Sequence, residues 1–430
     1  MQTIIDRSLQ PETKEIEKID IPQAKKFTLD NGIPVYSLTA GFQDLVKVEF
    51  LFLNKDFDVS NPLLNSATNR MLSEGTSKYT AQQLADHIDY YGSFFETDEN
   101  SDFSSIMLYS LNKHLEASLP FVSDIIHDPI FPLAELETYI RNNKQRLTVD
   151  NEKVSSLARR KFNEVIFGEK HPYGFFVQTS DFDKLKREHL IEHFKNKYSP
   201  SNCVIIISGL VKNDSIKLLN KFFGQPSNSH NEKLRNGQQL IFSPSSVNNH
   251  LIEKEGAVQS ALRIGKPFFN RAHADYPGMA VLNTLLGGYF GSRLMSNIRE
   301  DKGYTYGIGS AIVSMKQEGY FFISTEVGSD VTSSAIEEIY KEIEILKDEL
   351  VEADELEMAR NYMLGTFLKG MDGAFQLAER FKSIYLYDLD YSYYDRYLQK
   401  IRTIQPEEIQ ELARKYFDIS GFFEIVVGRK

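Results

Sequence analysis

The stretch REHLIEHFKNKY contains two histidines and a glutamate at the spacing of a zinc site. His189, Glu192 and His193 spell H-x-x-E-H, and on a helix the two imidazoles would lie one turn apart with the glutamate beside them. Imidazoles bind zinc, and a glutamate can take the proton from a zinc-bound water. One hypothesis is therefore a lone zinc peptidase that uses these three residues, and the elements around them must decide it.

The helix expected over residues 186–198 places both histidines away from its apolar face. At about 100° per residue, Ile191 and Phe194 lie on the apolar side, whereas His189 and His193 lie roughly 160° and 200° from Ile191. A catalytic zinc also needs a third protein ligand and a cavity that excludes water. We therefore interpret the motif as an incidental feature of a solvent-exposed helix face.

The bulk composition is that of a globular protein with more than one domain. The chain has 430 residues, of which 41% are hydrophobic and 25% charged, and its formal net charge is −11. Without a basic block, nucleic acid is not an expected partner. The N-terminal stretch has no signal-peptide pattern and no run of 18 apolar residues occurs, so the cytoplasm is the expected location and no membrane is expected as a partner. The lone Cys203 lies in an apolar run and is expected to be buried.

The two halves of the chain repeat one plan. Strand pairs, then helices, then a closing apolar strand occur in each half, and the second copy of the 186–198 helix, PEEIQELARKYF, carries Glu407 and Glu411 where the first has its two histidines. A nearly constant offset indicates an internal duplication. Three matches give offsets of 220, 218 and 219: Glu135–Glu137 with Glu355–Glu357, Lys197–Tyr198 with Lys415–Tyr416, and Gly209 with Gly428.

The expected fold class is α+β, with two homologous domains that each contain an antiparallel-rich sheet covered by helices. An N-terminal domain is predicted at 1–223, a polar linker at 224–239 and a C-terminal domain at 240–430. The turn pair Asn31-Gly32 predicts a hairpin. Helices are expected at about 61–73, 80–91, 113–127, 132–167, 186–198, 331–348 and 352–370.

The segment LLGGYFGSRLMSNIREDKGYTYGIGS at 285–310 resembles the C-terminal-domain signature of the pitrilysin/insulinase-like zinc metallopeptidases, in their processing-peptidase-like bacterial branch. KFTLDNGIPVY, MLSEGTSKYT and HPYG at 171–174 are similar to further family segments. The resemblance covers about 26–430, and its most specific part is 285–310. It implies two homologous domains in a clamshell arrangement.

The resemblance also implies where zinc should bind, and there the ligands are replaced. In the family an H-x-x-E-H helix directly precedes a segment like the one that begins at Met71. Here Ser66 and Arg70 occupy the positions of the two histidines. Asn69 occupies the position of the glutamate base, and Lys144 that of the third ligand. Serine is a weak zinc ligand and two cations would repel the metal, so no zinc is expected in this chain.

No carboxylate is expected to remain at the replaced zinc site to take a proton from water. Arg70 and Lys144 could instead bind an anion or a substrate carboxylate, or they could serve packing and salt bridges. Their residue types alone leave both alternatives open.

Arg299 and Tyr306, seven residues apart, match a pair that family members use to hold the substrate backbone and support the attacked carbonyl. Guanidinium and phenol are donors suited to a carbonyl or a developing oxyanion. The structural alternative is that Arg299 pairs with Glu300 or Asp301 and that Tyr306 is a core residue. Within the matching signature, the substrate-binding interpretation is favoured.

The resemblance and the H-x-x-E-H motif together give three hypotheses. The leading one is a non-catalytic, peptide-substrate-binding subunit of a heterodimeric zinc metalloendopeptidase, which supplies Arg299 and Tyr306 to a homologous partner that carries H-x-x-E-H and the zinc. The alternative is a structural or assembly subunit without a role in proteolysis. The third is the lone zinc peptidase built on His189, Glu192 and His193.

Overall fold

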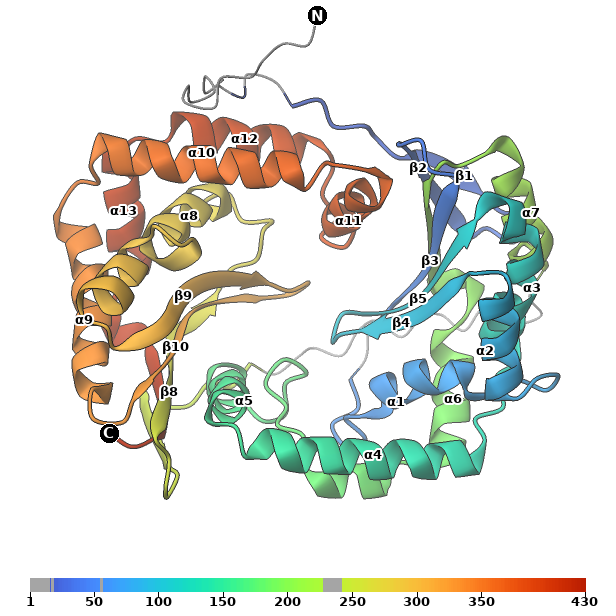
Figure 1. Ribbon diagram of the computed structural model, residues 1–430, viewed down its shortest axis with the longest axis horizontal. Coiled ribbons are helices and arrows are strands. Elements are labelled where there is room, and N and C mark those ends of the chain that lie inside the picture. Colours follow the sequence, from blue (N-terminus) through green and yellow to red (C-terminus); the bar gives the residue numbers. More distant parts are fainter. Residues whose placement is uncertain (1–15, 17–18, 55–56, 227–241) are drawn as a thin grey trace, which may run out of the picture.

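The computed structural model describes residue 16 and residues 19–54, 57–226 and 242–430, which form two similar halves (Figure 1). From residue 227 on, the predicted linker lies outside the described residues. The two sheets stand on opposite sides of the molecule, and one helix from each half lies between them.

The first half contains a six-stranded sheet in the order β1-β2-β6-β3-β5-β4. The pair β2–β6 is parallel and the other pairs are antiparallel. The predicted hairpin is confirmed, with Gly32 in the left-handed region (φ 91°) that glycine tolerates. The strands are β1 (Lys25–Thr28), β2 (Pro34–Thr39), β3 (Leu45–Leu53), β4 (Phe94–Glu99), β5 (Phe103–Leu111) and β6 (Cys203–Gly209).

The second half repeats this sheet with five strands in the order β7-β11-β8-β10-β9. Its one parallel pair, β7–β11, corresponds to β2–β6, and the remaining pairs are antiparallel. The α+β class and the duplication are thus confirmed. The strands are β7 (Asn249–Glu253), β8 (Gln259–Phe268), β9 (Thr305–Ser314), β10 (Gly319–Gly328) and β11 (Phe423–Gly428).

Helices cover both sheets, mostly where the sequence predicts them. The N-cap predicted at Thr80 is confirmed, because its hydroxyl accepts from Gln83 N and the Gln83 side chain accepts from Thr80 N. The helices are α1 (Leu64–Met71), α2 (Ala81–Tyr90), α3 (Asn112–His127), α4 (Leu133–Asn151), α5 (Val154–Phe167), α6 (Arg187–Lys197), α7 (Asn213–Phe223), α8 (Tyr276–Asn283), α9 (Thr332–Asp348), α10 (Ala353–Lys369), α11 (Ala374–Tyr385), α12 (Ser392–Thr403) and α13 (Pro406–Tyr416).

The single helix predicted over 132–167 is wrong, because the chain turns at Glu152–Lys153 and continues as α5. The turn lets α5 leave its own half and pack on the second sheet, where Ala158 and Phe162 join the core with Ala261 and Tyr320. Periodicity alone cannot show such a break, since both helices are amphipathic.

The equivalent helix of the second half makes the reciprocal crossing. Helix α11 packs on the first sheet, where Leu377 and Phe381 contact the cluster that includes Leu38 and Ile206. The long helices α4 and α10 lead to α5 and α11 along opposite edges of the molecule (Figure 1). The predicted boundaries assign α5 to the first copy and α11 to the second, and each of these helices packs on the sheet of the other copy.

A ring of four charges joins β3 to α11. Lys47 Nζ lies 3.0 Å from Glu49 Oε2 and 2.7 Å from Glu379 Oε1. Lys382 Nζ lies 2.8 Å from Glu49 Oε1 and 2.7 Å from Glu379 Oε2. Each cation therefore contacts both anions. Lys47 and Glu49 are buried, so the ring stabilises the crossing only while all four partners are present.

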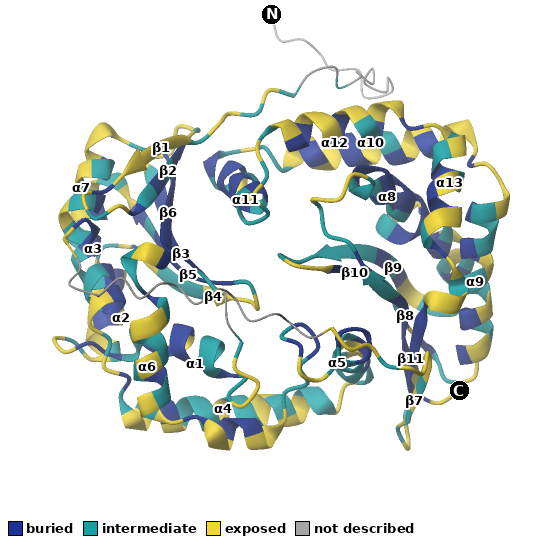
Figure 2. Ribbon diagram, turned by 180° about the vertical axis from the view of Figure 1, so that it is seen from behind, coloured by how far each residue is buried: buried dark blue, intermediate teal, exposed yellow. Residues whose placement is uncertain are grey.

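Each half has its own apolar core between the sheet and its outer helices. Val48, Leu108 and Ile205 are buried in the first core, and Ile264 and Ile323 in the second. Each such side chain contributes about 1.5–3 kcal/mol on burial. Figure 2 shows the central strands, such as β6 and β8, as buried, and Cys203 is buried as expected. Among the described helices, none has the length and apolarity needed to cross a membrane.

Candidate functional site

Helix α1 presents the replaced zinc ligands to a pocket of about 550 Å³ between α1, β4 and α4. Ser66, Asn69 and Arg70 all line it, so the structure brings together these three predicted positions. Asn69 is buried and donates through Nδ2 to Asp98 O (2.8 Å) and Ser105 O (3.3 Å), while its Oδ1 accepts from the Tyr198 hydroxyl (3.0 Å). The side chain at the position of the general base is therefore used to join α1 to the sheet.

Lys144, expected at the third-ligand position, does not line this pocket. Its ammonium pairs with Asp183 at 2.5 Å, which agrees with the salt-bridge alternative, and the pocket-lining residues of α4 include Tyr139 and Arg146 instead. Tyr139 and Arg146 are seven residues apart and share one helix face with Glu135. Arg146, on the same helix face as Glu135, therefore brings a cation to the pocket that Lys144 does not line.

The expectation that no carboxylate remains near the replaced ligands is also wrong. Glu74, Glu99 and Glu135 line the same pocket. Burial raises the pKa of Glu74, and the nearby Glu135 raises it further. Burial likewise raises the pKa of Glu99, with a further contribution from Asp98. Nevertheless, no group of three or more His, Cys, Asp or Glu side chains converges on a metal position within the described residues.

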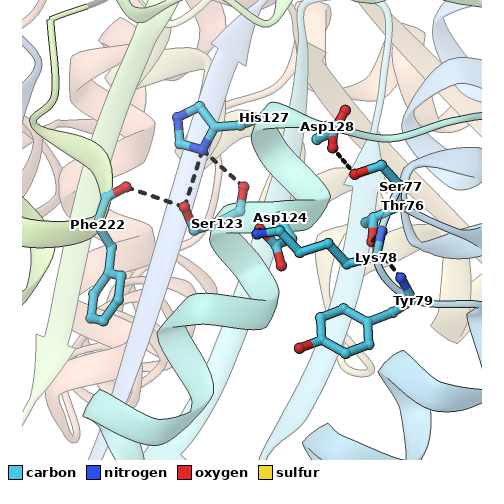
Figure 3. Close-up of polar contacts among 9 residues, drawn as sticks. All are labelled: Thr76, Ser77, Lys78, Tyr79, Ser123, Asp124, His127, Asp128 and Phe222. Atoms are coloured by element: carbon cyan, nitrogen blue, oxygen red, sulfur yellow. Dashed lines mark hydrogen bonds and ion pairs between the residues drawn. The ribbon is translucent and has the colours of Figure 1, made fainter.

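The loop that follows α1 is fixed to the end of α3 (Figure 3). Ser77 donates to Asp128, and Lys78 Nζ lies 2.6 Å from Asp124 Oδ1. The hydroxyl of Thr76 accepts from Tyr79 N at 3.1 Å. These contacts fix the loop that resembles the family segment MLSEGTSKYT to α3.

The HLIEH helix, α6, lies against α1 on the outside of the first half. His189 and His193 are half-buried and Glu192 is exposed, whereas the equivalent Glu407 and Glu411 are exposed. The expected full solvent exposure is therefore wrong for the histidines. His189 Nδ1 is buried without a hydrogen-bond partner among the described residues. Both imidazoles belong to the helix packing, and no third ligand accompanies them in the described parts of the chain.

We expect the purified chain to contain far less than one equivalent of zinc. Because the ligand sets at both α1 and α6 are incomplete, His193→Ala should leave the metal content unchanged. Inductively coupled plasma mass spectrometry of the wild type and of this variant measures it. Stoichiometric zinc that His193→Ala removes would instead establish the lone-peptidase hypothesis.

Arg299 and Tyr306 lie together at the start of β9. The Nε of Arg299 donates to the carbonyl of Tyr306 at 3.1 Å, and its guanidinium lies 4.8 Å from the ring centroid of the exposed Phe290. The contact to Glu300 is long, at 3.5 Å. Tyr306 is 95% exposed, so the interpretation of this residue as a core side chain is wrong. The structure thus leaves the phenol of Tyr306 available to a ligand.

A π-helical turn at Met295–Asp301 positions Arg299, a local geometry that is frequent at functional sites. The segment before it is fixed by a fork-to-fork pair: Arg293 Nε and Nη2 each lie 2.8 Å from an oxygen of Glu355 on α10. The Arg/Tyr pair therefore lies on a firmly supported segment, although its surroundings are open.

Tyr306 also lines a cavity of about 620 Å³ between α5 and the second sheet. Arg159 of α5 and Arg263 of β8 line the same cavity. The sequence could not indicate these two residues as neighbours, because α5 belongs to the other half and its crossing is a tertiary feature.

Comparison with known proteins agrees with this arrangement. Residues 184–363 match the family model of the peptidase M16 inactive domain. The chain is 21% identical over 349 residues to an uncharacterised zinc protease, YmxG, of Bacillus subtilis, covering 81% of this chain and 84% of the relative. It is 21% identical over 368 residues to the non-peptidase homolog YmxG of Helicobacter pylori, covering 84% and 83% respectively.

A crystal structure of a peptidase M16 inactive domain from Pseudomonas fluorescens superimposes with a TM-score of 0.81 at 20% identity, and the match covers 95% of this chain and 98% of that one. At this identity the structural match shows a shared fold. Together with the sequence matches, it makes this chain similar in sequence and fold to the M16 peptidases, the pitrilysin/insulinase-like zinc metallopeptidase family, and its α1 lacks the family's zinc-binding motif.

Proposed function

We propose that this chain is the non-catalytic, peptide-binding subunit of a heterodimeric zinc metalloendopeptidase. The proposal rests on the exposed side chain of Tyr306, whose backbone carbonyl accepts a hydrogen bond from Arg299. In the same chain, the α1 pocket lacks the zinc ligands. A homologous partner with H-x-x-E-H on the equivalent helix would bind the zinc and activate the water.

The division of labour follows from the chemistry of the two residue sets. Arg299 and Tyr306 can donate hydrogen bonds to the peptide backbone and to the oxygen that becomes negative when water attacks the scissile carbonyl. Neither residue can generate the nucleophile, because that step needs a metal-bound water or a strong base. The partner's zinc and this chain's donors would have to meet on the same peptide bond.

Reconstitution tests the proposal. The chain and a homologous subunit of similar length that carries H-x-x-E-H are purified separately and mixed, and cleavage of an unstructured peptide library is followed by mass spectrometry. We expect a one-to-one complex by size exclusion, with cleavage by the mixture and none by either subunit alone. The partner's His→Ala zinc-ligand variant serves as the control and should abolish cleavage by the mixture.

Two results would contradict the proposal. Full activity of the partner alone would show that this chain supplies nothing to hydrolysis. A stable complex that never cleaves peptides would favour a structural or assembly role instead.

A further inference from the structure

Arg263 on β8 is a buried cation whose hydrogen-bonding groups are not satisfied. The residue is 8% exposed, and its Nε and Nη1 have no hydrogen-bond partner among the described residues. Its guanidinium carbon lies 4.1 Å from the ring centroid of Phe322 and 5.7 Å from that of Phe162. A buried charge without a counter-ion destabilises a fold, so Arg263 is costly unless an anion joins it.

The duplication provides an internal comparison for this position. In the second sheet Ile425 of β11 pairs with Arg263, and in the first sheet the equivalent Ile206, at an offset of 219, pairs with Glu49. Arg263 therefore occupies the place that Glu49 occupies in the other copy. Both are buried charges on the sheet face that receives the crossing helix.

The two crossing helices differ in whether they supply a counter-ion to the buried charge. An offset of 220 relates Glu379 and Lys382 of α11 to Arg159 and Phe162 of α5. In the first half, Lys382 compensates Glu49 at 2.8 Å. In the second half, Phe162 stands at the position of Lys382, so its ring faces Arg263 where an anion would be needed. Arg159 stands at the position of Glu379. One copy is thus neutralised by the protein, whereas the other is left with two arginines.

Both arginines line the cavity of about 620 Å³ that Tyr306 also lines. Among the described lining residues Glu326 is the one carboxylate, and it is exposed. Burial and, to a smaller extent, the nearby Arg159 lower the pKa of Arg263 to about 10, with Tyr320 opposing the shift. Arg263 therefore remains a cation at neutral pH and needs a counter-ion from outside the chain.

We propose that Arg263 and Arg159 form a carboxylate-binding subsite that receives an acidic residue of a peptide, next to the backbone position at Arg299 and Tyr306. Guanidinium groups bind carboxylates through two parallel hydrogen bonds, and such bonds are strong where water is excluded. The subsite would select peptides with an acidic residue, or a free C-terminus, close to the bond presented to the partner. It rests on the proposed function only in taking the ligand to be a peptide.

Fluorescence anisotropy on the isolated full-length chain tests the subsite without hydrolysis. Three short, labelled, unstructured probes are compared: one with a central glutamate and an amidated C-terminus, its glutamine counterpart, and the glutamine peptide with a free C-terminal carboxylate. We expect one carboxylate-bearing probe to bind roughly 30-fold more tightly than the amidated glutamine probe. The probe that gains affinity identifies the side-chain or the terminal carboxylate as the ligand.

Variants then assign the preference to the subsite. Arg263→Met and Arg159→Gln should each remove it, and Arg263→Met should keep or raise the melting temperature because it removes an uncompensated buried charge. The matched control is Arg160→Gln, which removes a charge from the same helix at a side chain that stacks on Phe176 at 4.0 Å and does not line the cavity. It should retain the preference.

Four results would overturn the subsite: equal binding of all probes, a preference that survives Arg263→Met, its loss in Arg160→Gln, or displacement of every probe by inorganic phosphate alone. A purely structural role of Arg263 between the two rings would lower the melting temperature of Arg263→Met without any carboxylate preference. Because no partner is present, these outcomes are independent of whether reconstitution gives an active peptidase.

Discussion

The Glu49→Gln variant is expected to lower the free energy of unfolding by about 3–5 kcal/mol, the range for a buried ion pair that loses one partner. Glu49 is 1% exposed and contacts both Lys47 and Lys382. The substitution leaves two lysine ammonium groups at the β3–α11 crossing with Glu379 as their shared anion. Urea or thermal unfolding, followed by circular dichroism, measures the loss.

A surface pair in the same half gives the control. Asp214 and Lys217 lie 2.9 Å apart, and both side chains are about 80% exposed (79% and 80%), so Asp214→Asn should change stability by less than about 1 kcal/mol. If Glu49→Gln unfolds as readily as Asp214→Asn, the ring does not stabilise the crossing.

The pH dependence of the ring has a definite sign. Burial opposes the charge of Lys47, but Glu49 and Glu379 overcome this effect and raise its pKa, so its contribution is present below about pH 10 and is lost at higher pH. Burial also opposes the charge of Glu379, yet Lys47 and Lys382 lower its pKa, so its contribution is present above about pH 4–5 and is lost on acidification. The wild-type advantage over Glu49→Gln should therefore be largest in the neutral range.

The Tyr306→Phe and Arg299→Ala variants are each expected to slow peptide cleavage by the assembled complex about 10²–10³-fold, the loss measured when one oxyanion donor is removed. Tyr306 is fully open to a ligand, and its phenylalanine variant loses only the hydroxyl. For a donor used in the transition state, kcat should fall more than KM rises. Steady-state kinetics on a single peptide separate the two constants.

Tyr90 offers a matched control for the hydroxyl. It is 82% exposed on α2 of the other half and far from the Arg/Tyr pair in sequence, so Tyr90→Phe should leave kcat unchanged. Equal rates for the wild type, Tyr306→Phe and Arg299→Ala in an intact complex would exclude a role of the pair in hydrolysis.

The sequence predicts this fold well because its signals are local. The turn at Asn31-Gly32, the cap at Thr80 and the fully apolar strand β6 all depend on neighbouring residues, and the structure confirms each. The crossing of α5 and α11 depends on contacts between residues far apart in the sequence, such as Phe162 with Ala261 and Phe381 with Leu38, so no local pattern could indicate it.

The candidate site likewise contains residues that a local sequence signal brings together and residues whose positions depend on tertiary contacts. Ser66, Asn69 and Arg70 lie together at the α1 pocket because they share one turn of helix, whereas Lys144 does not line the pocket and Arg146 does. A two-residue error in alignment rotates a helical side chain by about 200°, which moves it to the opposite face. The half-burial of His189 and His193 is a tertiary feature as well, because α6 packs against α1.

The exchange of α5 and α11 makes the molecule equivalent to a domain-swapped dimer whose two subunits have been joined into one chain. Neither half can cover both faces of its own sheet, because the helix that packs on one face comes from the other half. The covalent connection keeps the exchanged helices at a high effective concentration, so assembly of the halves does not depend on the protein concentration. A gene cut between the copies should therefore yield two fragments that fold only together, whereas either fragment alone would expose an apolar sheet face and aggregate.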